Sequence, residues 1–305
     1  MTFTLKILGS NSATPAYGRH HTSQLLNIEH HHFLIDCGEA SQIQMQRFRC
    51  KPLRINHIFI SHLHGDHYLG LMGLVFTMHL LGRKKDLHIY GQKGLDEIIT
   101  LQLKYSDTRL NYSIRFHQLD PENEELIFED NILTVTSFPL THRIPCCGFL
   151  FSEKPKLRRM NKEKLPEKIN ISEIQRLKEG KDVMDENGYV KYAYKEYTLP
   201  PRKSRSYAYC SDTAYEPGII PHIRNADVLY HEATFLNERR QWAEKTFHST
   251  TTQAAEIARK ANVGKLLIGH YSARYKDLTE FLREASEIFP KTILATEGET
   301  IEFKD

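Results

Sequence analysis

The sequence has few of the features that mark secreted or membrane-spanning proteins. Its cysteines are odd in number and form no CxxC pair: Cys37, Cys50, Cys146, Cys147 and Cys210. This pattern argues against a disulfide framework and predicts a reducing, cytoplasmic setting. The longest apolar run, from Leu69 to Leu81, is much shorter than the ~20 residues that span a bilayer. The stretch Met1–Gly9 lacks a signal-peptide pattern, so no membrane segment is expected.

The chain also has little excess charge. Its 41 Lys and Arg residues against 38 Asp and Glu give a net charge of +3 over 305 residues. Any binding of nucleic acid must therefore depend on local positive charge. With 40% hydrophobic and 26% charged residues, the composition is that of a globular protein able to bury a large core.

Strand and helix patterns alternate through both halves of the chain. Strands are expected at Thr4–Leu8, Ser23–Ile28, His32–Asp36, His57–Ser61, Leu87–Tyr90, Ser113–Gln118, Ile132–Pro139, Gly148–Ser152, Ser206–Cys210, Val228–Glu232, Lys265–Gly269 and Thr292–Ala295. Helices are expected at Tyr68–Leu81, Leu95–Tyr105, Thr252–Ala261 and Asp277–Phe289. This alternation predicts a layered α/β protein.

One stretch, residues 153–199, interrupts the alternation. Seven Lys and Arg residues face two Glu residues between positions 154 and 168, and four tyrosines follow, at Tyr189, Tyr192, Tyr194 and Tyr197. A short helix is expected at Ile171–Lys178. Taken alone, the stretch favours a solvated surface insertion, because most charge runs are solvated. The alternative is an arm that binds phosphates and stacks tyrosines on RNA.

Four potential metal ligands lie within six residues directly after a predicted strand: His62, His64, Asp66 and His67. Side chains i and i+2 share one side at a strand end, so His62 and His64 can bind one ion. The turn at Gly65 then directs Asp66 and His67 to a neighbouring position. Imidazole nitrogens and carboxylate oxygens suit Zn²⁺. This density predicts a metal site and not a set of unrelated surface histidines.

This HxHxDH run resembles the metallo-β-lactamase superfamily, which implies an αββα sandwich with a dinuclear site at one edge. The family also has a distant histidine, a bridging aspartate and a last histidine, and these match His142, Asp212 and His270. The resemblance therefore implies two zinc ions per subunit. One ion is bound by His62, His64 and His142, the other by Asp66, His67 and His270, and Asp212 bridges the two ions. Paired ions activate water and stabilise phosphoryl oxygens.

Further motifs resemble the ribonuclease Z family of tRNA 3′-processing endonucleases. These are Gly38-Glu-Ala-Ser-Gln42, His231-Glu232-Ala-Thr and Phe247-His248-Ser-Thr, and the resemblance extends from Leu8 to Tyr275. It implies one domain over residues 1–305, in which residues 153–199 are the family's basic, flexible tRNA-binding arm. Pro201-Arg-Lys-Ser-Arg205 resembles the family's PxKxR loop near the acceptor end of tRNA. Ala40 departs from the glycine that is usual in the first motif.

The resemblance implies removal of the 3′ trailer from precursor tRNA, which leaves a 3′-hydroxyl on the tRNA. It also implies a homodimer in which the arm of one subunit holds tRNA for the metal site of the other. Asp66 is the expected proton acceptor. His248 is the expected proton donor to the leaving oxygen, oriented by Glu232 or His231.

Two other functions fit part of the pattern. One is a different dizinc hydrolase of the same fold that acts on a small ester, sulfate or phosphodiester, although such a substrate needs neither the arm nor the PxKxR segment. The other is a non-catalytic RNA-binding protein that keeps zinc for stability, although the complete ligand set argues against it. The tract His30-His31-His32 is expected to be a hairpin turn with solvated histidines and not a metal site.

Overall fold

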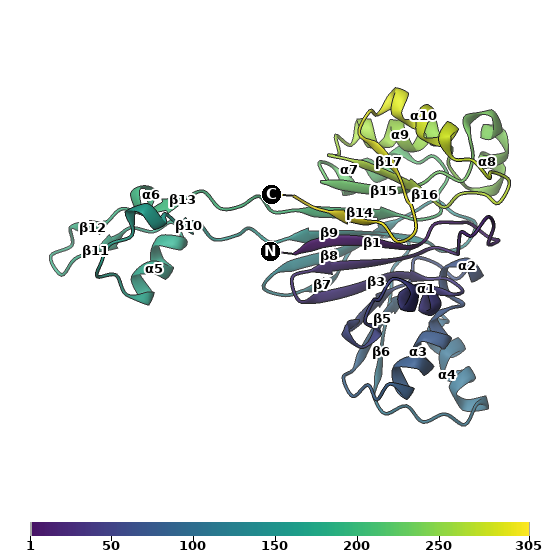
Figure 1. Ribbon diagram of the computed structural model, residues 1–305, viewed down its shortest axis with the longest axis horizontal. Coiled ribbons are helices and arrows are strands. Elements are labelled where there is room, and N and C mark those ends of the chain that lie inside the picture. Colours follow the sequence, from purple (N-terminus) through teal and green to yellow (C-terminus); the bar gives the residue numbers. More distant parts are fainter. Residues whose placement is uncertain (1, 305) are drawn as a thin grey trace.

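Two seven-stranded β-sheets pack face to face in the computed structural model, which describes residues 2–304 (Figure 1). Met1, the first residue of the N-terminal stretch considered above, and Asp305 lie outside this range. The first sheet consists, in order, of β18 (Thr300–Glu302), β1 (Phe3–Gly9), β2 (Ser23–Ile28), β3 (His31–Cys37), β4 (His57–Phe59), β5 (Leu87–Gly91) and β6 (Ile114–Gln118). The second consists of β17 (Thr292–Leu294), β16 (Leu266–Gly269), β15 (Val228–Glu232), β14 (Ser206–Cys210), β9 (Cys147–Glu153), β8 (Leu133–Pro139) and β7 (Glu125–Glu129).

Helices cover the outer face of each sheet (Figure 1). Over the first sheet lie α1 (Ser41–Arg47), α2 (Gly65–Tyr68), α3 (Leu71–Leu80) and α4 (Leu95–Tyr105). Over the second lie α7 (Ile220–Ile223), α8 (Arg240–Thr246), α9 (Thr251–Lys260) and α10 (Thr279–Ile288). Three apolar clusters result, one between the sheets and one under each helical layer. The predicted αββα metallo-β-lactamase sandwich is confirmed.

The parallel strands determine where polar side chains meet. Strands β3, β4 and β5 run parallel in the first sheet, and β14 to β17 run parallel in the second. Parallel strands end at the same edge of a sheet, and α/β proteins bind ligands in the loops there. The HxHxDH segment follows β4, and the loops with Asp212 and His270 follow β14 and β16. Both sheets therefore present these loops at one edge of the sandwich.

A separate projection extends from the sandwich between β9 and β14 on two extended segments (Figure 1). It contains β10 (Arg159–Met160), α5 (Ile171–Lys178), β11 (Val183–Met184), β12 (Val190–Tyr192), α6 (Tyr194–Tyr197) and β13 (Thr198–Leu199). Leu177 and Val183 are buried within it, and Asn170 and Glu173 form a capping box at the start of α5. The arm therefore has a folded tip, and the helix expected at Ile171–Lys178 is confirmed.

Most predicted elements are present, several with the predicted bounds, such as β2, α4, β14 and β15. The continuous helix predicted over Tyr68–Leu81 is wrong, because α2 ends at Tyr68 and α3 begins at Leu71. The Gly70 amide donates to the Cys37 carbonyl at 2.9 Å and not within a helix. A Cβ atom on Gly70 would lie 2.0 Å from the Gly38 carbonyl oxygen, so this close approach requires glycine.

Candidate metal centre and active site

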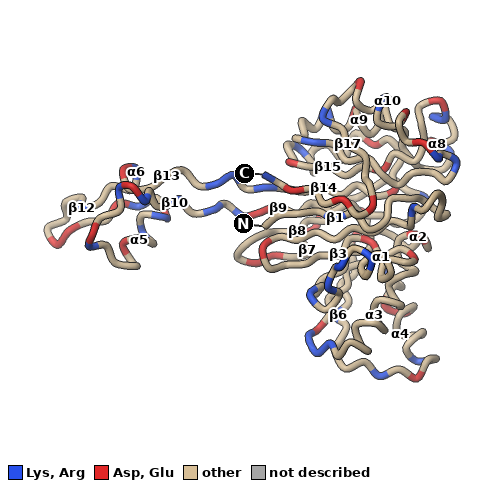
Figure 2. The backbone as a smooth tube through the Cα atoms, viewed as in Figure 1, with Lys and Arg blue, Asp and Glu red and all other residues tan. Residues whose placement is uncertain are grey.

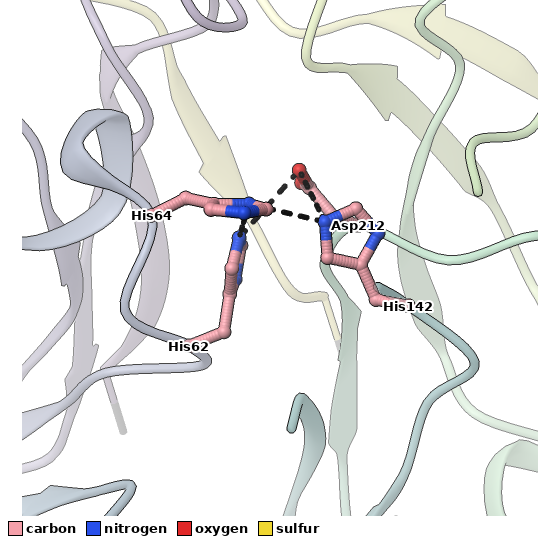
Figure 3. Close-up of side chains that lie close together, drawn as sticks. All are labelled: His62, His64, His142 and Asp212. Carbon is pink, nitrogen blue, oxygen red and sulfur yellow. Dashed lines mark hydrogen bonds and ion pairs between the residues drawn. The ribbon is translucent and has the colours of Figure 1, made fainter. Parts of the chain in front are cut away.

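Seven polar side chains from the loops after β4, β8, β14 and β16 meet at one edge of the sandwich. The structure brings all seven predicted metal ligands together here. The ligand atoms of the first group, His62, His64, His142 and Asp212, lie within 4.8 Å of one another. The same holds for the second group, Asp66, His67 and His270. In Figure 3 the side chains of the first group point toward one another, His62 and His64 from one loop and His142 and Asp212 from two others.

The separations between ligand atoms match those expected around a metal ion. In a tetrahedral zinc site with bonds of about 2.1 Å, neighbouring ligand atoms lie about 3.4 Å apart. His64 Nδ1 lies 3.1 Å from His62 Nε2 and 3.1 Å from His142 Nε2. In the second group, His270 Nε2 lies 3.3 Å from His67 Nε2 and 3.4 Å from Asp66 Oδ2. Each group can therefore surround one ion with little rearrangement.

Asp212, a member of the first group, also faces the second group, because its two carboxylate oxygens point to different sides. Its Oδ2 is 3.7 Å from His62 Nε2, and its Oδ1 is 3.3 Å from His67 Nε2 and 3.2 Å from His270 Nε2. The residue is 2% exposed, and Oδ1 has no hydrogen-bond partner among the described residues. Buried polar atoms are seldom left unpaired. A carboxylate in this position fits a pair of cations that it bridges.

In four of these histidines, Nδ1, the ring nitrogen that points away from the cluster, contacts another group of the protein. Each lies near an oxygen: His62 Nδ1 near Ser61 Oγ (3.0 Å), His67 Nδ1 near Asp36 Oδ2 (2.7 Å), His142 Nδ1 near the Phe247 carbonyl (3.0 Å) and His270 Nδ1 near Thr234 Oγ1 (2.9 Å). When Nδ1 donates its proton to these acceptors, Nε2 keeps a free lone pair toward the centre. Such second contacts are the usual support of metal-binding histidines.

Asp36, two residues before the Gly38–Gln42 motif, supports the metal ligands, a part that the sequence did not indicate. Besides His67, its Oδ2 accepts hydrogen bonds from Tyr209 (2.6 Å) and Ser61 (2.9 Å). Asp36 adopts a left-handed φ of 53°, as does His270 with a φ of 62°. Residues other than glycine rarely adopt this conformation, and they cluster at functional sites. The signal available in the sequence was an aspartate as the last residue of an apolar predicted strand, His32–Asp36.

His248 and Glu232 form a pair beside the metal ligands. His248 Nδ1 lies 2.7 Å from Glu232 Oε1 and 3.9 Å from Asp212 Oδ2. Glu232 is fully buried and also accepts hydrogen bonds from Thr213 and Thr234. Burial lowers the pKa of the His248 imidazole, but the Glu232 carboxylate outweighs burial and raises this pKa to about 9. The pair therefore holds a proton at the edge of the metal cluster.

His231 lies apart from this site. Adjacent strand residues point to opposite faces of a sheet, so His231 and Glu232 point in opposite directions. His231 is fully buried, and its Nδ1 donates to the Glu232 carbonyl at 2.7 Å. Among residues 2–304 its Nε2 has no hydrogen-bond partner, and no contact joins it to the metal ligands. Of the two residues expected to orient His248, Glu232 is in contact with it and His231 is not.

Asp66 belongs to the cluster and is also anchored from outside it. The Ala13 amide donates to Asp66 Oδ2 at 2.7 Å. Burial alone would raise the pKa of the Asp66 carboxyl, but the neighbouring His67 and His270 hold it far below its usual range. Asp66 is therefore ionised, which is the form that binds a metal or accepts a proton.

A cavity of about 640 Å³ opens over the cluster, and Asp66, Asp212 and His248 line it. The exposed Arg143 and Arg274 also line this cavity. Within residues 2–304, neither arginine forms an ion pair with a carboxylate. Guanidinium groups bind phosphates in bidentate geometry. The cavity therefore suits an anionic substrate such as a phosphodiester.

No residue of the PxKxR segment, 201–205, is among those that line this cavity. Arg205 is 3% exposed, and its guanidinium pairs with Glu153 at 2.6 Å. Lys203 pairs with Asp227. The segment joins the arm to the first residue of β14, whereas Asp212 follows the last. It therefore anchors the arm at the opposite edge of the sandwich.

Comparisons with known proteins identify relatives along the whole chain. A family model described as "Anti-Pycsar protein Apyc1" matches residues 3–157, which end before Asp212. The ribonuclease Z of Cytophaga hutchinsonii is 52% identical over 305 residues, covering 100% of this chain and 97% of that protein. The ribonuclease Z of Bacteroides fragilis is 46% identical over 297 residues, covering 97% of each chain.

Solved structures agree with these relatives. The short form of human tRNase Z aligns with a TM-score of 0.71 and 27% identity over 98% of each chain. The metallo-β-lactamase fold protein YhfI of Bacillus subtilis aligns with a TM-score of 0.70 and 18% identity, over 99% of this chain and 100% of that one, which supports the fold alone. With full-length relatives at these identities, the chain belongs to the ribonuclease Z family.

Proposed function

We propose that this chain is a zinc-dependent endoribonuclease that removes the 3′ trailer from precursor tRNA and leaves a 3′-hydroxyl on the tRNA. The observation that carries the proposal is the seven-ligand cluster under an arginine-lined cavity, in a chain that belongs to the ribonuclease Z family. The arginines of the cavity and the phosphates of RNA are complementary in charge.

Two zinc ions would be held at this cluster. His62, His64 and His142 would bind the first, and Asp66, His67 and His270 the second, with Asp212 between them. Mixed imidazole and carboxylate ligands are typical of zinc. When bound, the ions supply an activated water and stabilise the charge on the phosphoryl oxygens.

Two side chains of the protein would accept and donate the protons of the reaction. Asp66, held ionised beside His67, is the candidate acceptor of the proton from the attacking water. His248, protonated through its contact with Glu232, is the candidate donor to the 3′-oxygen that leaves the phosphorus. The Glu232 carboxylate, fixed by Thr213 and Thr234, orients His248 and maintains its charge.

The arm would bind the RNA at a distance from the metal cluster of its own subunit. Lys and Arg residues lie along its two extended segments, while Asp and Glu residues gather near the tip at β11 and β12 (Figure 2). Of its four tyrosines, only Tyr189 is exposed, at 73%. Tyr192 and Tyr197 pack against each other, and Arg158 lies over Tyr194. We infer that phosphate contacts along the extended segments, more than tyrosine stacking, hold the tRNA.

The position of the arm supports a homodimer. From Ser206, at the base of the arm, to Asp212 the chain advances six residues, or about 20 Å at about 3.3 Å per residue. In Figure 1 the arm extends away from the sandwich at that base. An arm that points away from its own metal cluster can serve the cluster of a second subunit.

An apolar surface on α2 and α3 is the candidate dimer interface. Leu69, Leu80 and Leu81 are 56%, 81% and 55% exposed. Helix α3 carries apolar residues around its whole circumference, and such helices are normally buried. We propose that this surface packs against a second copy.

The five cysteines are free, which fits a reducing compartment such as the cytoplasm. No helix in residues 2–304 is long and apolar enough to cross a membrane.

Metal removal tests the proposal. Purified protein treated with a chelator should lose cleavage of precursor tRNA, and added zinc should restore it. Asp212→Asn should keep the shape of the site but bind less zinc and lose cleavage, because the bridging charge is gone. Full cleavage by protein shown to be free of metal would contradict the proposal.

A further inference from the structure

We propose that His30, His31 and Asp130 form an additional binding site for a divalent transition-metal ion, separate from the metal centre. One ligand atom from each of these residues lies within 4.8 Å of the others. His30 belongs to the turn between β2 and β3, and His31 begins β3, both in the first sheet. Asp130 belongs to the turn between β7 and β8, in the second sheet. An ion here would link the two sheets directly.

Two of the three ligands are held in place by the fold. Asp130 Oδ1 accepts the amides of Ile132 at 2.7 Å and Leu133 at 2.9 Å, so Oδ2 is left to face His31 Nε2 at 2.7 Å. The His31 ring stacks on Phe33 with centroids 5.3 Å apart. Such preorganisation lowers the entropy cost of binding an ion.

The third ligand is free to complete the site. The His30 ring lies 4.1 Å from that of His31, is exposed, and forms no hydrogen bond in the described part of the chain. Two imidazoles and one carboxylate favour zinc and its neighbours among the divalent metals over calcium or magnesium. Solvent has access on the side of His30, so water can fill the remaining position.

The short contact between His31 and Asp130 determines how the site responds to metal. At 2.7 Å it is a hydrogen bond, shorter than the about 3.4 Å that separates two ligands of one zinc ion. An ion bound to these two atoms must take the place of the proton between them, which moves to the other ring nitrogen of His31, and must move the two groups apart. Binding is therefore weaker than at the central cluster, where the spacing already fits.

A metal ion at this site would stabilise the fold near the base of the arm. The Lys154 amide donates to the Ile132 carbonyl at 2.7 Å, and the Lys154 ammonium pairs with Glu129 at 2.6 Å. The turn that carries Asp130 is therefore joined to Lys154, where the arm begins to leave the sandwich. An ion that joins the two turns would stabilise the sandwich at the point where the arm leaves it.

An unspecific histidine tract is the competing explanation, and His32 distinguishes the two. Successive strand residues point to opposite faces, so His32 points away from His31 and Asp130. A flexible tract would bind metal through all three histidines. The proposed site uses His30 and His31 and does not use His32.

The test is equilibrium dialysis of the full-length protein against buffered free zinc, with bound zinc measured by mass spectrometry. The wild-type protein should bind one more zinc ion, more weakly, than the central cluster holds. His30→Ala and Asp130→Asn should each lose that ion, whereas the control His32→Ala should keep it. All three variants should cleave precursor tRNA like the wild type. Equal zinc binding by the wild type and His30→Ala, or an equal loss in His32→Ala, would overturn the proposal. His30→Ala removes only an exposed side chain, so it should fold normally.

Discussion

His248 differs from the other histidines of the active site in what holds it. Its Nδ1 contacts the Glu232 carboxylate at 2.7 Å, and Nε2 is left for the cavity that His248 lines. We therefore expect His248→Ala to retain both metals and tRNA affinity but to cleave precursor tRNA about 10²–10⁴-fold more slowly, the usual contribution of a general acid. Single-turnover kinetics with zinc-saturated protein measure this.

Asp66→Ala provides the contrast, because Asp66 is placed among the ligands of the second ion. That variant should lose zinc as well as activity. If His248→Ala cleaved at nearly the wild-type rate, or lost zinc to the same extent as Asp66→Ala, the assignment of His248 as proton donor would be wrong.

The charge of His248 should also be visible in a titration. In metal-free protein its pKa is raised from 6.5 to about 9. A group with a raised folded-state pKa stabilises the fold fully below about pH 6.5, and this stabilisation is lost as the pH rises through about 9. Glu232→Gln removes the carboxylate responsible, so the His248 pKa should fall and this stabilisation should disappear. Histidine NMR titration of both metal-free proteins measures the shift, and the same pKa in both would contradict the account.

At the scale of elements, the arm should be separable from the chemistry. None of the three apolar clusters of the sandwich includes a residue between positions 154 and 205. Replacing residues 154–204, which include both basic extended segments, by a short flexible linker should abolish cleavage of precursor tRNA but leave hydrolysis of a small chromogenic phosphodiester nearly unchanged. The wild-type affinity for tRNA should also fall steeply with salt, since phosphate contacts release counterions.

The control for the arm is a shorter deletion, of residues 183–192, that keeps the basic extended segments and removes only β11 and β12, where acidic residues gather. It should bind tRNA better than the full replacement. Equal loss of both activities in the full replacement would show that the arm supports the fold of the metal site.

The elements of the sandwich were largely predictable from the sequence, because strong apolar patterns mark buried strands such as β14 and β15. Elements with weak patterns were missed, including β7 at a sheet edge, the short β18 and the polar helices α1 and α8. Ala40 shows a second limit, since it adopts a left-handed φ of 65° at the start of α1 without being glycine. Tertiary contacts decide such positions.

The candidate site was predictable where ligands are local in sequence and less so where they are not. The spacing of His62, His64, Asp66 and His67 indicated a metal site by itself, while the choice of His142, Asp212 and His270 depended on family resemblance. The supporting contacts of Asp36 and Thr234 join residues from different strands, which no local pattern reveals. The buried pairing of Arg205 with Glu153 was missed for the same reason.

At the scale of the whole molecule, we expect the arm of one subunit to hold tRNA for the active site of the other subunit of a dimer. Two defective chains test this: one in which the linker replaces residues 154–204, and one with Asp212→Ala and an intact arm. Each alone should fail to cleave precursor tRNA. In mixed dimers, the intact arm should serve the intact metal site of its partner and restore part of the activity.

Native mass spectrometry gives the fraction of mixed dimers, and the recovered activity should follow it. Adding Leu80→Glu to both chains should separate the subunits and prevent recovery, because it places a charge in the exposed apolar surface. Mixed dimers without recovered activity would contradict service across the dimer.

The central claim is that the seven-ligand cluster cuts precursor tRNA at its 3′ end. The most direct measurement is incubation of zinc-loaded protein with a 5′-end-labelled precursor tRNA, followed by mapping of the product at nucleotide resolution and analysis of its 3′ end. The account predicts one cut at the start of the trailer, a 3′-hydroxyl on the tRNA and no product with Asp212→Ala. An uncut precursor, scattered cuts or a 3′-phosphate would contradict it.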